Sequence, residues 1–259
     1  MKTVGFFWLG SELPWFNQVA IRTFQEIGHP IEVFCEPILK DTVKDLPLRD
    51  YREIVDEALL ERLGPKLRVS ADIFRLLLMR DSGHVWVDCD SIALKPLPNK
   101  DLILAKANSE SDLLNNNVLR IPANAPELIE ALDIALDIEA IPEWVPARRS
   151  QKARLQSGKH RREIITARQT TFAPDLLNYV FRNSDAIECA FNSEYFNPIG
   201  NRDGYKLFSV ENSIADVSTD KSCLVHFYQS NVREFLLRSG PIKGTIIGDL
   251  AMEFGFTPA

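Results

Sequence analysis

The first 35 residues contain two apolar runs on either side of a helical pattern, and this arrangement restricts the fold most strongly. Residues 3–9 form a mostly apolar run, and residues 31–35 form a second one. Between them, residues 15–27 place apolar side chains at helical spacing and end at Gly28-His29-Pro30, a typical helix terminator. Two strands joined through a helix lie parallel with a right-handed crossover. We therefore expect an α/β fold on a parallel sheet.

The size and composition indicate a globular protein of one large domain or two small ones, and the sequence has no internal repeat or low-complexity linker that would favour two. The chain has 259 residues, of which 45% are hydrophobic and 25% are charged, values close to those of ordinary globular proteins. A chain of this length buries roughly 70–75% of its unfolded surface. No uncharged apolar run approaches the ~18–20 residues of a membrane helix, and the first apolar run is too short for a signal peptide. We expect a single domain over residues 1–259.

The cysteines and the net charge narrow the class of protein further. The sequence contains four widely spaced cysteines and no Cys-x-x-Cys pair: Cys35, Cys89, Cys189 and Cys223. This pattern favours free thiols in a reducing, cytoplasmic compartment. The formal net charge of −6 argues against a dedicated nucleic-acid-binding protein.

Residues 147–168 differ from the rest of the chain because they are strongly basic. They contain a single acidic residue, Glu163, and eight basic ones: Arg148, Arg149, Lys152, Arg154, Lys159, Arg161, Arg162 and Arg168. One interpretation is a solvated, mobile loop with a helical end. In the other interpretation, this stretch contacts an anionic acceptor, or it binds the protein peripherally to the inner face of a membrane.

The remaining patterns alternate between helix and strand. Helices are predicted over residues 51–63, 70–82, 125–139 and 174–182, with Ser70 as an N-cap. Strands are predicted over residues 84–90, 102–106, 117–121, 187–191, 206–208 and 223–227.

Two aspartates, Asp88 and Asp90, stand at the carboxyl end of the strand predicted at residues 84–90. Alternation along a strand puts both carboxylates on one face and Cys89 on the other. Ligands of open α/β sheets bind at the carboxyl ends of strands. Neighbouring carboxylates repel each other unless a cation compensates, and Mg²⁺ or Mn²⁺ commonly bridges carboxylates to a diphosphate. The competing interpretation is a solvated turn.

The region around these aspartates resembles the DXD region of glycosyltransferases, most closely glycosyltransferase family thirty-two and its capsular-polysaccharide relatives. That region has Ser-Asp-x-x-Arg before a helix and Gly-Gly-x-Tyr-x-Asp-x-Asp after it. This chain departs from it mildly, with Ala71 for Ser, Ser82-Gly83-His84 for Gly-Gly-Ile, and Trp86 for Tyr. Weaker matches follow the family's order at residues 6–10, 114–118, 172–174, 195–199 and 225–228.

The resemblance implies a GT-A-like, nucleotide-binding α/β/α sandwich on a mainly parallel mixed sheet. It places a donor half over about residues 1–122 and an acceptor half over about 123–259. It also implies a hexosyltransferase of polysaccharide biosynthesis. Such an enzyme moves a sugar from a nucleotide-sugar donor to a glycan or lipid-linked acceptor, with retention of anomeric configuration. No Asp or Glu stands out as a nucleophile, so double displacement and front-face displacement both remain open.

Matched by position, the resemblance implies Mn²⁺ or Mg²⁺ held by Asp88, Asp90 and His226. It implies catalytic roles for Asp88, Asp90 and Asn116, and donor contacts by Trp8, Asp72, Arg75, Asp88, Asn116 and Asn117. Asp112 is a further polar candidate near the donor sugar. A surface ion pair is the alternative for Asp72 and Arg75, which are three residues apart on one helix. A structural role is the alternative for His226, and we expect one for His29 and His84.

Two other functions fit parts of the sequence. A phosphatase of the haloacid-dehalogenase type also has Asp-x-Asp after a buried strand, and Gly248-Asp249 with Glu253 imitates its late acidic motif. In that family, however, the motif follows the first strand. A nucleotide-sugar-binding protein without turnover is the non-enzymatic alternative.

Overall fold

The computed structural model of the protein describes residues 1–64 and 66–257. Residues 65, 258 and 259 lie outside this part, and the last two fall within the expected acceptor half. Among the described residues, the helices are all too short or too polar to cross a membrane.

A six-stranded sheet forms the centre of the fold, in the order β3-β2-β1-β4-β7-β6. Strand β1 pairs in parallel with β2 and β4, and β2 pairs in parallel with β3. Strand β7 is antiparallel to both β4 and β6. The strands are β1 Val4–Trp8, β2 Ile31–Cys35, β3 Leu48–Asp50, β4 Val85–Val87, β6 Ile103–Asn108 and β7 Ser111–Arg120. The expected α/β class and its mainly parallel mixed sheet are confirmed.

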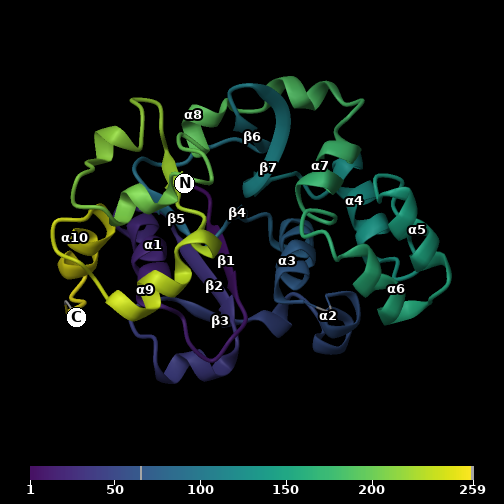
Figure 1. The fold of residues 1–259 in the computed structure, drawn as a ribbon, viewed down its shortest axis with the longest axis horizontal. Coiled ribbons are helices and arrows are strands. Elements are labelled where there is room, and N and C mark those ends of the chain that lie inside the picture. The colour runs from purple at the N-terminus through teal and green to yellow at the C-terminus, as the bar shows by residue number, and fades with distance from the viewer. Residues whose placement is uncertain (65, 258–259) are drawn as a thin grey trace.

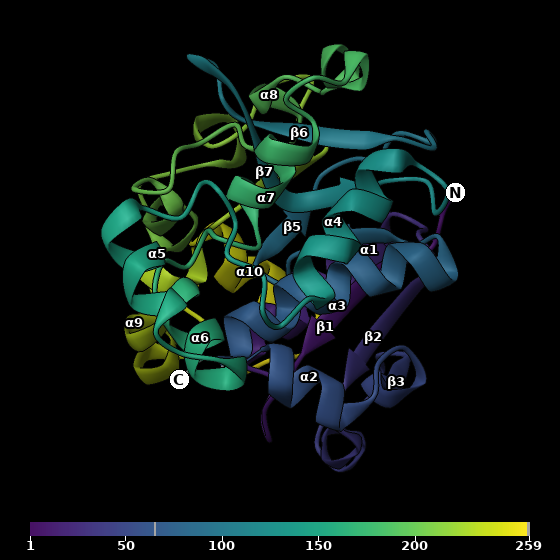
Figure 2. The same ribbon diagram turned by 90° about the vertical axis from the view of Figure 1, so that its right-hand side faces the viewer.

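Helices α1 (Trp15–Glu26) and α3 (Leu67–Ser82) cover opposite faces of this sheet. Successive residues of β1 point to opposite faces. Phe6 packs edge-on against Phe24 of α1 at 5.4 Å between ring centroids, and Phe7 stacks on Phe74 of α3 at 4.1 Å. Figure 1 shows α1 and α3 on either side of β1, and in Figure 2 α3 lies in front of β1 and β2. Strand β1 is therefore apolar throughout because both of its faces are covered.

Helix α3 leads directly to the aspartate pair. It ends at Gly83, which adopts a left-handed conformation with φ of 65° and turns the chain into β4. Its start differs from our prediction, since α3 begins at Leu67 and Ser70 lies inside it. The Ser70 hydroxyl donates to the Gly64 carbonyl at 3.1 Å instead of capping the helix.

The other helices agree with the prediction in place more than in length. The helix expected at 51–63 is divided into a 3-10 turn, Tyr51–Glu53, and α2, Glu57–Leu63, because the Asp56 carboxylate caps a new helix at the Leu59 amide. Helices α4 Pro126–Leu136 and α7 Pro174–Val180 are shorter than expected. Three short helices follow later in the chain: α8 Ser193–Phe196, α9 Arg233–Ser239 and α10 Ile246–Glu253.

Two predicted strands are wrong. Residues 187–191 overlap the 3-10 turn Asp185–Cys189, and Phe191 alone bridges to Ala105 of β6. Residues 206–208 belong to the 3-10 turn Gly204–Phe208. Both apolar runs are too short for periodicity to separate a strand from a turn of helix. The strand expected at 223–227 is present as β8, Leu224–His226.

The basic region forms two helices, α5 (Ala147–Arg154) and α6 (Gly158–Ile165), so the interpretation as a mobile loop is wrong. One of its arginines is part of the core. Arg162 is fully buried, donates to the carbonyls of Leu63 at 3.0 Å and Ala135 at 2.5 Å, and lies 3.6 Å over the Phe172 ring. Arg162 is therefore unavailable to an acceptor or a membrane.

We expect Arg162→Met to lower the free energy of unfolding by about 2–4 kcal/mol, because the carbonyls of Leu63 and Ala135 would lose their buried donor. Urea denaturation measures this difference. Arg148→Met is the matched control, since Arg148 is exposed on α5, and we expect it to change the stability by less than about 0.5 kcal/mol. Equal effects of the two substitutions would contradict a structural role for Arg162.

Candidate functional site

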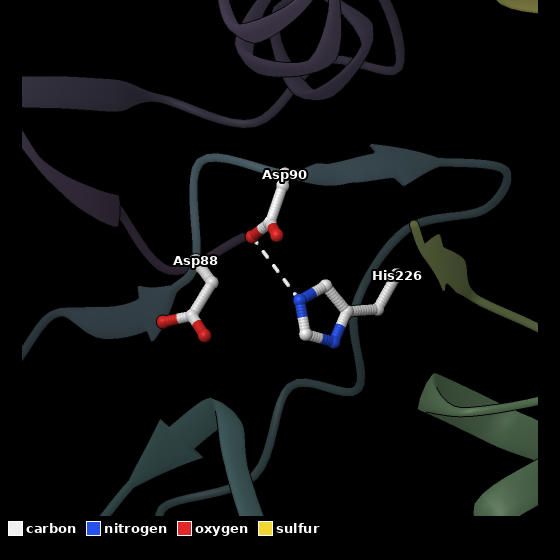
Figure 3. A group of neighbouring side chains, drawn as sticks. All are labelled: Asp88, Asp90 and His226. Atoms are coloured by element: carbon white, nitrogen blue, oxygen red, sulfur yellow. Dashed lines mark ion pairs between the residues drawn. The ribbon is translucent and has the colours of Figure 1, made fainter. Parts of the chain in front are cut away.

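The chain brings Asp88, Asp90 and His226 together at the carboxyl end of β4. Asp88 and Asp90 lie in the tight turn between β4 and β5, the short strand Ser91–Ala93. Strand β5 pairs antiparallel with β8, and this register places Ser91 opposite His226. One ligand atom from each of the three residues lies within 4.8 Å of the others. Figure 3 shows the three side chains pointing into one space.

Each member of this cluster is held by a neighbouring group. The Nε2 atom of His226 lies 3.1 Å from Oδ1 of Asp90. The other carboxylate oxygen of Asp90 accepts a hydrogen bond from the backbone N–H of Gln229 at 2.8 Å. Oδ1 of Asp88 accepts the indole N–H of Trp86 at 2.7 Å. Cys89 faces the core, where its Sγ donates to the Phe7 carbonyl. The two carboxylates therefore lie on the same side of the chain, with Cys89 on the other.

Arg75 connects α3 to this cluster. Its Nη2 atom lies 3.0 Å from Oδ1 of Asp72 and 3.6 Å from Oδ1 of Asp88. Its Nη1 atom donates a hydrogen bond to the backbone carbonyl of Asn116 at 2.7 Å. The Asp72 and Arg75 side chains are 3% and 6% exposed, so the alternative of a surface ion pair is wrong. Arg75 thus compensates two carboxylates at once and fixes α3 against β7.

Burial and mutual interaction set the charges of the cluster. Burial raises the pKa of Asp72 to about 7, although Arg75 and Arg68 oppose the shift. Burial likewise raises the pKa of Asp88 against the effect of Arg75. For Asp90, burial opposes ionisation, but His226 and the Gln229 amide lower the pKa overall. Burial alone would lower the pKa of His226, whereas the Asp90 and Asp88 carboxylates raise it overall. The carboxylates thus favour positive charge at the place where His226 lies.

A cleft of about 610 Å³ opens over the cluster. Three arginines, Arg68, Arg75 and Arg233, line it together with the two aspartates and His226. Its aromatic wall includes Trp8, whose indole N–H donates to the Glu12 carbonyl at 2.8 Å and whose ring lies 5.6 Å from the Arg233 guanidinium. A volume in this range is typical of small-molecule sites, about 300–1,000 Å³. Acidic ligands for a cation, several arginines and a flat ring fit a metal-bound nucleoside diphosphate.

The other candidates lie outside the lining of this cleft. Asn117 is fully buried, and its side-chain amide donates to the Phe196 carbonyl at 3.3 Å. The backbone carbonyl of Asn117 accepts a hydrogen bond from the backbone N–H of Asp88. Asn116 contacts Arg75 through its carbonyl. Asp72 lies behind Arg75, and Asp112 forms an ion pair of 2.6 Å with Lys106 on the β6–β7 hairpin. In this structure Asn116, Asn117 and Asp72 support the residues of the cleft.

His29, His84 and the late acidic motif at Asp249 are separate from the cluster of Asp88, Asp90 and His226. Nε2 of His29 accepts the Leu97 amide at 2.9 Å, and Nε2 of His84 lies 2.9 Å from a Glu32 oxygen. Asp249 on α10 accepts the Gly244 amide. Among the described residues, only Asp88, Asp90 and His226 form a group suited to a metal ion. The arrangement therefore does not support the phosphatase, which needs its late acidic residues beside the aspartate pair.

Four further residues line the cleft, Arg68, Tyr228, Gln229 and Arg233. Tyr228 belongs to the weak match at residues 225–228 but was given no role there, and the sequence did not indicate the other three. Arg68 could have been found, because it lies on the same face of α3 as Asp72 and Arg75, four and seven residues before them. Arg233 has no such signal, since its place depends on how α9 packs.

The donor set fits a divalent cation. Two carboxylates and an imidazole are suitable ligands for Mn²⁺ and, less well, for Mg²⁺. In addition, Nδ1 of His226 is buried and has no hydrogen-bond partner. Buried polar atoms are normally paired, so the ring keeps one unused interaction while its Nε2 atom faces Asp90.

Comparisons with known proteins give short or distant similarities. No family model matches the chain. Over 62 residues the chain is 37% identical to the initiation-specific alpha-1,6-mannosyltransferase of Candida albicans, a match that covers 22% of this chain and 16% of that protein. The solved PaToxG glycosyltransferase aligns with a TM-score of 0.49 at 15% identity, over 71% of this chain and 69% of its own. The ligand-free glycosyltransferase domain of the YGT toxin aligns with a TM-score of 0.45 at 9% identity, over 98% and 93%.

We expect Asp90→Asn and His226→Ala each to weaken Mn²⁺ binding about tenfold or more, because each removes a ligand from the cluster. The electron paramagnetic resonance signal of free Mn²⁺ during titration measures this affinity. Asp112→Asn is the matched control, since it removes a carboxylate outside the cluster. Unchanged Mn²⁺ affinity in both cluster variants would contradict a metal site here.

Proposed function

We propose that this chain is a metal-dependent glycosyltransferase that moves a sugar from a nucleotide-sugar donor to a glycan or lipid-linked acceptor. The observation that supports this proposal best is the convergence of Asp88, Asp90 and His226 in one cleft with arginines and Trp8. The short match to a mannosyltransferase agrees with it.

The cleft can hold both parts of a nucleoside diphosphate. Asp88, Asp90 and His226 would hold Mn²⁺ or Mg²⁺, which when bound neutralises charge on the diphosphate leaving group. Arg68 and Arg233 add positive charge from two different helices. Trp8 offers an aromatic surface for the base at the end of β1.

The residues around the two carboxylates fix them before a ligand arrives. The Trp86 indole and the Arg75 guanidinium hold Asp88, and the Gln229 amide holds Asp90. Groups fixed in this way need little reorganisation when charge develops in the transition state. Asn116 and Asn117 act one step further away, through Arg75 and the Asp88 amide.

The lining of the cleft also bears on the route of transfer. Among the described lining residues, the carboxylates are Asp88 and Asp90, both committed to the cation cluster. This supports front-face displacement with retention rather than a covalent intermediate on the chain. In this route the bond between the anomeric carbon and the diphosphate breaks, the acceptor oxygen bonds to that carbon, and its proton passes to the diphosphate.

We also propose that this chain lies in the cytoplasm and that its helix α5 contacts an anionic membrane surface. Arg148, Lys152 and Arg154 are exposed on this helix, and Leu155 after it is 80% exposed. Cys35, Cys89 and Cys223 are buried as free thiols, as expected in a reducing compartment.

We expect Mn²⁺-dependent release of nucleoside diphosphate from a UDP- or GDP-sugar. Asp88→Asn and Asp90→Asn should each reduce this rate about 10²–10³-fold. The reduction in the double variant should be smaller than the product of the two single reductions, because both residues act on one ion. A coupled assay for UDP and GDP measures the rate, with Asp112→Asn as the control.

Three results would contradict this proposal. Normal turnover of folded Asp90→Asn would remove the role of the cluster. Tight donor binding without turnover would support the non-catalytic alternative. Phosphate release from an aryl phosphate with Mg²⁺ would support the phosphatase.

A further inference from the structure

A second cavity, of about 670 Å³, adjoins the cleft. It lies between the β6–β7 hairpin, α7 and the segment before α5, and none of the three metal-cluster residues lines it. Tyr228 lines both the cavity and the cleft. The two spaces therefore meet at this side chain.

Tyr228 is held at this boundary in an unusual conformation. Its φ of 50° and ψ of 60° lie in the left-handed region, which costs a residue other than glycine about 1 kcal/mol or more. Its ring centroid lies 4.0 Å from that of His226, and its hydroxyl donates to Oδ1 of Asn197 at 3.5 Å. A molecule in the second cavity would thus reach the metal cluster past one phenol ring.

The cavity presents aromatic and apolar surface. The rings of Trp144 and Tyr179 both line it, with centroids 4.5 Å apart. The Trp144 indole donates to the Thr171 carbonyl at 3.0 Å, which fixes the ring. Leu113 also lines the cavity and is 57% exposed. Rigid aromatic rings with a polar edge are well suited to the apolar face of a sugar ring.

The polar groups of the cavity are mainly amides. Four asparagines line it, Asn108, Asn115, Asn178 and Asn201. The Asn178 amide is already bonded to the backbone of Leu114 and Pro174. Asn115 donates one amide hydrogen to Asn197 at 3.2 Å, which leaves the second for a ligand. The charged lining residues, Arg168 and Asp175, form an ion pair of 3.3 Å and compensate each other. The cavity is therefore suited to a neutral ligand with hydroxyl groups.

We propose that this cavity is the acceptor subsite and binds a neutral pyranose at the end of an acceptor glycan. This inference rests on the proposed function, because the donor sugar would lie in the cleft on the other side of Tyr228. It differs from an anionic acceptor bound by α5, since the charges in this cavity are paired.

The test uses the full chain and the methyl α- and β-pyranosides of glucose, galactose and mannose as probes. Saturation-transfer difference NMR should detect binding of at least one of them. Leu113→Arg should abolish the signal, because it puts a long charged side chain into the cavity from an exposed position that the fold tolerates. Val210→Arg is the matched control, since Val210 is 66% exposed and outside the cavity, and it should leave the signal unchanged. Trp144→Phe, which keeps an aromatic ring, should weaken binding less than Leu113→Arg.

The same samples separate failure of this inference from failure of the proposed function. Binding of UDP or GDP with Mn²⁺, measured by calorimetry, should be equal in the wild type, Leu113→Arg and Val210→Arg. Nucleotide binding without binding of any pyranoside would overturn the acceptor subsite alone, and so would binding that survives Leu113→Arg. Binding of a serine- or tyrosine-containing peptide in this cavity instead would also overturn it. Loss of nucleotide binding in the wild type would count against the proposed function itself.

Discussion

Asp88 and Asp90 place two carboxylates in one largely buried cluster, and the rest of the site supplies what this arrangement requires. Like charges at low exposure are unfavourable unless positive charge or hydrogen-bond donors face them. Here Arg75 faces Asp88, while His226 and the Gln229 amide face Asp90. Arg75 comes from α3, whereas His226 and Gln229 both come from the last quarter of the chain. The pair of aspartates therefore depends on the complete fold, and the same compensation leaves the cluster ready for a divalent cation.

The fold brings these partners together through a few backbone contacts. The two-stranded pair β5–β8 carries His226 back from the last quarter of the chain to the residue after Asp90. Gly204 supports this return, because it lies against the Phe227 carbonyl so closely that a Cβ atom there would be 2.1 Å from the oxygen. On the other side, Gly83 ends α3 and directs β4 into the sheet. The position of the cluster is thus set by strand pairing and by glycines where the chain makes close approaches or turns.

Local patterns predicted the first half of the fold well, and features that depend on distant contacts were missed. The β1-α1-β2 unit follows from apolar periodicity and the Gly28-Pro30 terminator, all within one stretch of sequence. The aspartate pair at the end of β4 was recognisable for the same reason. Arg162 looked like a surface charge, because its partners Leu63, Ala135 and Phe172 come from three separate segments. Arg233 was missed in the same way, and Tyr228 was matched at residues 225–228 without a role, since the packing of the last 35 residues decides their place in the cleft.

Anomalous scattering from a crystal grown with Mn²⁺ and UDP would show directly whether Asp88, Asp90 and His226 bind the metal. We expect one strong manganese peak, from an ion bound by carboxylate oxygens of Asp88 and Asp90, by a ring nitrogen of His226 and by the diphosphate, with the base beside Trp8. A diphosphate held by Arg68, Arg75 and Arg233 with no manganese at the three residues would contradict it. A manganese ion bound elsewhere on the chain would contradict it equally.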